Sequence, residues 1–122
     1  MSNQRFEKER IYTEKNYKYI EDSLKNIEML IDNRDKKEVI QSKYKQMKEW
    51  LKIEYNKILK YKNNDGYISQ WYDPLISDIY VQSFSIANVN SPVDKIKLAI
   101  YDALDYFSYW NNMLIGYKNE RI

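Results

Sequence analysis

The sequence of 122 residues contains neither cysteine nor histidine. Zinc and haem sites of the usual kinds need these side chains, and so do the Ser-His-Asp and Cys-His pairs of many hydrolases. Any catalysis would therefore depend on Asp, Glu, Lys, Tyr or Arg, or on a metal held by carboxylates. Because this excludes most enzyme classes, we predict a non-catalytic protein that uses no cofactor and no metal.

Glycine and proline are also rare, with two of each. So few turn-forming residues argue against a sandwich or a barrel and favour a few long helices. No apolar run approaches the length of a membrane span, and the N-terminal MSNQRFEKER has no apolar signal core. We expect a cytoplasmic protein that does not enter a membrane.

The apolar residues recur at helical spacing in four stretches. They predict helices over residues 6–33, 36–62, 73–88 and 91–116, in one all-α domain covering residues 1–122. The bundle has four helices, or five if the first one breaks near Thr13. Residues 63–66, Asn-Asn-Asp-Gly, give the strongest turn signal. The first two helices, each about 40 Å long at 1.5 Å per residue, are predicted to form a hairpin.

The stretch 91–116 carries its own boundary signals. Ser91 is the predicted cap, Pro92 occupies the first turn, and Gly116 is the predicted stop. One side of this helix is apolar at Val93, Ile96, Ile100, Leu104, Phe107 and Leu114. A second side carries Leu98, Tyr101 and Tyr109, so the pattern predicts a helix at the centre of the bundle.

The net charge of +2 is unevenly distributed. Residues 1–62 hold 16 Lys and Arg against 11 Asp and Glu, whereas residues 63–122 hold four against seven, which gives +5 and −3. One face of the second predicted helix carries Lys43, Lys45, Lys48, Lys52, Lys57 and Lys60. Glu49 and Glu54 interrupt this face, so we interpret it as a solvated surface in preference to a nucleic-acid site.

Aromatic residues are numerous, with 13 tyrosines and three tryptophans. Most are expected in the core, with polar tips that reach the surface. Tyr67, Trp71 and Tyr72 fall in a predicted loop and not on a periodic face, so burial explains them less well. Because Tyr and Trp dominate binding hot spots, we predict that these three residues contact a partner.

Three aspartates of the second half have no local role in a turn or a helix cap: Asp78, Asp102 and Asp105. Asp102 and Asp105 are neighbours on one helix face, with Tyr109 one turn further on. Paired carboxylates can bind magnesium or act as acid and base, but no third ligand stands at a recognisable spacing. The pattern favours an acidic, aromatic surface that covers a basic site on another protein.

In size, composition and charge layout the chain resembles the small helical immunity proteins of bacterial toxin systems, including those of contact-dependent growth inhibition. The resemblance implies a stoichiometric inhibitor that covers the cleft of a nuclease toxin domain, as a monomer or a small homo-oligomer. The aspartates would face lysines and arginines of the toxin, with Trp71 and tyrosines as anchors. No family motif is present, and the positive first half departs from the strongly acidic members.

Two alternatives remain open at this point. One is a phage or plasmid accessory protein that binds a host factor or nucleic acid through its lysine face. The other is a structural subunit whose aromatic surface joins copies of the same chain.

Overall fold

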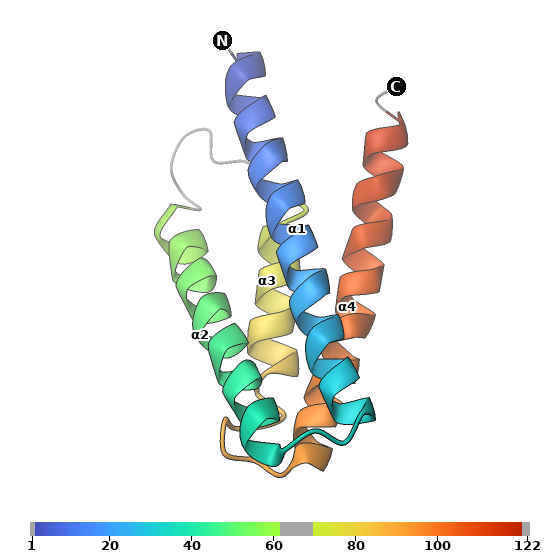
Figure 1. Ribbon diagram of the computed structural model, residues 1–122. Helices are drawn as coiled ribbons and strands as arrows, with labels where there is room; N and C mark the ends of the chain where they lie inside the picture. Colours follow the sequence, from blue (N-terminus) through green and yellow to red (C-terminus); the bar gives the residue numbers. More distant parts are fainter. Residues whose placement is uncertain (1, 62–69, 121–122) are drawn as a thin grey trace.

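The computed structural model describes the backbone of residues 2–61 and 70–120, and the side chains of residues 11–60 and 70–116. The chain folds as an all-α helical bundle, as predicted, and no strand occurs in the described ranges (Figure 1). Its elements are α1 (Ser2–Asp32), α2 (Lys37–Tyr61), α3 (Asp73–Ser77), the π-helix η1 (Asp78–Ser83) and α4 (Val93–Glu120). Among the described residues, no helix combines the length and apolarity needed to cross a membrane.

A short connection reverses the chain between α1 and α2, which run antiparallel (Figure 1). The N–H of Asp35 donates to the carbonyl of Leu30 at 2.9 Å, and the N–H of Arg34 donates to that of Ile31 at 3.0 Å. This pair of bonds is a Schellman motif, and it places Arg34 in the left-handed conformation with φ of 55°. Backbone hydrogen bonds therefore end α1 without the glycine that usually occupies this position.

The core lies between stripes of apolar side chains at helical spacing. Its fully buried members on the three long helices include Ile20, Leu24, Ile27, Ile40, Tyr44, Leu51, Ile96, Ala99, Ile100 and Ala103. Thr13 lies on the buried side of α1, and the helix runs through it without interruption. The predicted break at Thr13 is therefore wrong, because this residue extends the core stripe instead of capping a new helix.

The predicted helix over residues 73–88 is correct only in its first part. Asp73 begins α3, whose cap position is Tyr72. The chain then changes to the π-helix η1, where the N–H of Phe84 donates to the carbonyl of Ile79, five residues earlier, at 2.9 Å. This wider turn buries Ile79, Ser83 and Phe84 together. Hydrophobic spacing does not reveal a local change from 3.6 residues per turn.

Both predicted boundaries of the last helix differ from the structure. The hydroxyl of Ser91 accepts a hydrogen bond from the N–H of Asn88 at 2.8 Å, so it closes the preceding turn and does not cap α4. Helix α4 also continues through Gly116 to Glu120. Gly116 has open space around its Cα, and nothing in its surroundings requires a glycine.

Helix α4 packs with one side only, mainly against α1 and η1. Ile96, Ile100, Phe107 and Leu114 are buried as predicted. Helix α4 contacts α1, α2, α3 and η1, as expected of a central helix. The apolar second side is not enclosed, however, because Leu98 is 59%, Tyr101 41% and Tyr109 56% exposed.

Candidate functional site

A pocket of about 350 Å³ lies between η1 and α4. Asp78 comes from η1, whereas Asp102, Asp105, Tyr106 and Tyr109 come from α4. Four residues that the sequence singled out as a possible partner-binding surface are thereby brought to one place. The packing of η1 along α4 positions them, since Asp78 lies 24 residues from Asp102 in the chain.

Two of the three carboxylates in this pocket are held by neutral donors. The indole Nε1 of Trp110 donates to Oδ2 of Asp78 at 2.8 Å. The hydroxyl of Ser83 donates to Oδ2 of Asp102 at 2.8 Å, whereas the Asp105 side chain is exposed. Neutral donors orient a carboxylate without cancelling its charge, and each carboxylate keeps further lone pairs for other donors. The pocket is therefore suited to accept hydrogen bonds from a cationic group.

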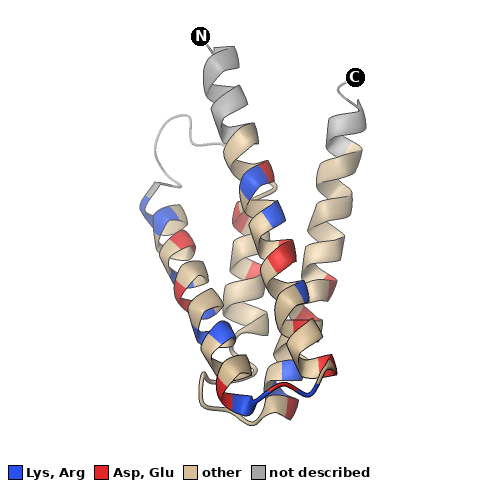
Figure 2. Ribbon diagram, viewed as in Figure 1, with Lys and Arg blue, Asp and Glu red and all other residues tan. Residues whose placement is uncertain are grey.

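The surroundings of the pocket contain few positive charges. None of the pocket aspartates forms an ion pair with a described side chain; the ion pairs in the described part of the chain include Lys18 with Asp22, Lys25 with Glu21, and Lys57 with Glu54. In Figure 2 the Lys and Arg positions lie mainly along α1 and α2, whereas most of α4 is free of either charge. No group of three potential metal ligands is found among the residues that the structure describes.

Trp71 and Tyr72, which were predicted to contact a partner together with Tyr67, do not line this pocket. Tyr72 is 1% exposed, so its side chain is not accessible to a partner in the folded protein. The expectation that this tyrosine is not a core residue is therefore wrong. Trp71 is partly buried against the core, and its backbone carbonyl accepts a hydrogen bond from the Tyr17 hydroxyl. Tyr67 lies outside the described residues.

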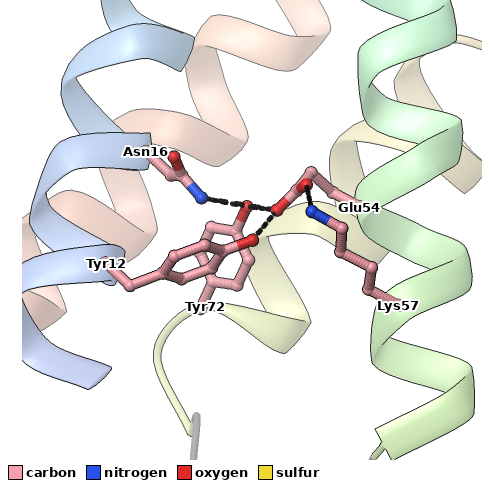
Figure 3. Close-up of polar contacts among 5 residues, drawn as sticks. All are labelled: Tyr12, Asn16, Glu54, Lys57 and Tyr72. Atoms are coloured by element: carbon pink, nitrogen blue, oxygen red, sulfur yellow. Dashed lines mark hydrogen bonds and ion pairs between the residues drawn. The ribbon is translucent and has the colours of Figure 1, made fainter. Parts of the chain in front are cut away.

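A second polar cluster surrounds the buried carboxylate of Glu54, which is 3% exposed (Figure 3). Its Oε1 accepts hydrogen bonds from the hydroxyls of Tyr12 and Tyr72, the latter at 2.6 Å. Asn16 Nδ2 donates to the Tyr72 hydroxyl at 2.9 Å and to Oε1 at 3.3 Å, while Lys57 Nζ lies 3.0 Å from Oε2. This cluster joins α1, α2 and the residue that precedes α3.

The charge state of Glu54 follows from competing effects. Burial alone would raise its pKa, but hydrogen bonds from Tyr12, Tyr72 and Lys57, together with the Lys57 charge, lower the pKa below its ordinary value. Burial raises the pKa of Tyr72, and the hydrogen bond to Glu54 raises it further. The cluster is thus one ionised carboxylate held by neutral hydroxyls. Its ties between three segments support a role in holding the bundle together.

Sequence reasoning placed Glu54 on the lysine face, and the structure corrects this. The position lies seven residues after Met47, three after Leu51 and four before Ile58, which is the spacing of the buried stripe. That spacing was the available signal. Residue type points the other way, because glutamate is almost never fully buried unless it is paired.

Comparison of the chain with protein-family models, with curated proteins and with solved structures finds no match in any of the three.

Proposed function

We propose that this chain is a non-catalytic inhibitor that binds a bacterial toxin, a nuclease domain, in a stoichiometric complex within the cytoplasm, as immunity proteins do. The observation that best supports this proposal is the pocket between η1 and α4, where Asp78, Asp102, Asp105 and Tyr109 meet. These residues combine negative charge with an aromatic side chain that is 56% exposed. Such a surface complements the basic cleft of an enzyme that binds nucleic acid.

The charge distribution supports the same class of partner. Residues 63–116 contain six aspartates and only two lysines, for a net charge of −4. A nuclease holds the phosphate backbone with Lys and Arg, and an inhibitor that covers this cleft offers carboxylates in place of phosphates. Because Trp110 and Ser83 already hold the carboxylates of Asp78 and Asp102, binding orders fewer flexible groups and loses less entropy.

The first experiment concerns the reading frame adjacent to the one that encodes this chain. If its product ends in a toxic domain, that domain is expressed in bacteria with and without this protein. We expect growth arrest in its absence, rescue in its presence, and a one-to-one complex on size-exclusion chromatography with light scattering. A capsid or replication gene beside this frame, together with nucleic-acid binding that weakens steeply with salt, would contradict the proposal and favour the lysine face instead.

The second experiment tests the pocket within that complex. Asp78→Asn, Asp102→Asn and Asp105→Asn each remove one charge, while an amide oxygen remains to accept the bonds from Trp110 and Ser83. We expect each variant to weaken toxin binding by at least about tenfold, which corresponds to 1.4 kcal/mol. Asp32→Asn, at an exposed carboxylate at the end of α1, is the matched control and should bind normally. Unchanged affinity in all three pocket variants would exclude the acidic pocket as the interface.

A further inference from the structure

The outward side of α4 carries a row of exposed apolar side chains that Asp105 interrupts. Leu98, Tyr101, Tyr109 and Met113 are 59%, 41%, 56% and 41% exposed. They follow one another at three, eight and four residues, with Asp105 in the gap, so they line one side of the helix. We call these five residues the outer strip. It spans residues 98–113, and at 1.5 Å per residue it is about 22 Å long.

The shape of the outer strip suits another helix. A row of exposed apolar side chains along one side of a helix is the kind of surface that an amphipathic partner helix recognises. No other helix buries it in the described part of the chain, because the buried residues of α4, which include Ile96, Ile100 and Phe107, lie on the opposite side of the helix.

The charges of the outer strip determine which helix fits. From residue 98 to residue 116 the only charged residues are Asp102 and Asp105, and no Lys or Arg occurs. Pairing of α4 with a second copy about a twofold axis through this strip would place Asp105 beside its own equivalent, which is repulsive. A partner with a Lys or Arg near the middle of its apolar row avoids this repulsion and gains an ion pair.

The aromatic members of the outer strip also suit a cation. Lys97 Nζ already lies 5.5 Å from the centre of the Tyr101 ring within this chain. Tyr109 lines the pocket beside Asp102 and Asp105, so a second cation that enters there meets both an aromatic ring and carboxylates.

We propose that the outer strip docks an amphipathic helix of a partner protein, whose apolar side chains cover Leu98, Tyr101, Tyr109 and Met113. A lysine or arginine at the centre of that helix reaches Asp102 and Asp105. The proposal rests on the proposed function, since it specifies which part of the partner this surface contacts.

Three synthetic helical peptides of equal length test the proposal without a toxin. The first has an apolar row matched to the outer strip with lysines at its centre, the second has glutamates there, and the third is a scrambled version of the first. Binding is measured by fluorescence anisotropy, and the site is located by NMR shifts of backbone amides. We expect the lysine peptide to bind at residues 98–113, and the other two to bind at least about tenfold more weakly.

Variants of the protein test whether the lysine peptide binds at the outer strip. Tyr109→Lys and Leu98→Lys should each reduce binding of the lysine peptide at least about tenfold. Ile53→Lys makes the same change in charge at a side chain on α2 that is 56% exposed, and it should bind as the wild type does. Equal losses in all three variants, equal binding of the scrambled peptide, or no binding of the lysine peptide would overturn the proposal.

Sedimentation over a concentration series tests the competing occupant. We expect a monomer throughout; a dimer that Tyr109→Lys abolishes would show that a second copy covers the strip, contrary to the proposal. The outcomes separate the two ideas. Peptide binding without rescue from a toxin contradicts the inhibitor function alone, whereas toxin binding without peptide binding contradicts helix docking alone.

Discussion

Replacement of Glu54 by glutamine tests the buried cluster that joins α1, α2 and the start of α3. Glutamine has nearly the same shape and keeps an oxygen acceptor, so the substitution removes the charge without opening a cavity. A hydrogen bond to a charged acceptor contributes about 1.5–3 kcal/mol, against about 0.5–1.5 kcal/mol for a neutral one. Because the hydroxyls of Tyr12 and Tyr72 both donate to Oε1, the expected loss is about 1 kcal/mol for each bond.

We therefore expect Glu54→Gln to lower the free energy of unfolding by about 2 kcal/mol. The lowered pKa of Glu54 supports the sign, since it means that the hydrogen bonds and Lys57 outweigh the cost of burying the charge. For a chain of this length the loss corresponds to a decrease in Tm of roughly 8 °C. Urea unfolding followed by far-UV circular dichroism measures the free energy directly.

Two controls isolate the contribution of the hydroxyl groups. Glu49→Gln makes the same substitution at an exposed site on the same helix and should change stability by less than about 0.5 kcal/mol. Lys57→Met removes only the ion pair, and because the lysine is half exposed we expect a loss below about 1 kcal/mol. A Glu54→Gln variant as stable as the Glu49→Gln control, with an unchanged slope in urea, would refute the reasoning.

The remaining predictions concern pH and helix α4. Because the pKa of Glu54 is lower in the folded state than its ordinary value of 4.5, its stabilisation is fully present above pH 4.5 and is lost as the pH falls through the folded-state pKa. The difference in unfolding free energy between the wild type and Glu54→Gln should therefore narrow in an acidic pH series, and a constant difference would contradict this. Gly116→Ala should raise the unfolding free energy by about 0.5–1 kcal/mol, because Gly116 lies within α4 with open space for a methyl group. A decrease in Tm for this variant would show that the position requires glycine.

Apolar spacing was sufficient to predict the all-α bundle and most of its core. The buried rows that include Ile20, Leu24, Tyr44, Leu51 and Ile100 stand at intervals that only a helix brings to one side. Residue type alone was not sufficient to predict where the last helix, α4, begins and ends. A serine before proline typically begins a helix, and a glycine typically ends one. In the structure the hydroxyl of Ser91 accepts a hydrogen bond from the N–H of Asn88 in the preceding turn, and α4 continues through Gly116.

In the candidate sites, too, contacts within one helix could be predicted from the sequence, whereas contacts between elements could not. The acidic residues on one helix, Asp102 and Asp105, could be paired from their spacing, but the approach of Asp78 depends on how η1 packs against α4. The Glu54 cluster depends on Tyr12 and Tyr72, which are 42 and 18 residues away in the chain. No local sequence pattern indicates that these side chains contact one another, because their contacts depend on how the helices pack.

The π-helix η1 has a consequence for how the pocket between η1 and α4 can change. A π-turn accommodates about one residue more than an α-turn, so it shifts the register of every side chain that follows. If the same six residues wound as an α-helix, at about 100° per residue, Asp78 and Ser83 would stand about 140° apart, and these two side chains would no longer face α4 together. The acidic pocket therefore depends on the wide turn of η1 as well as on the aspartates themselves.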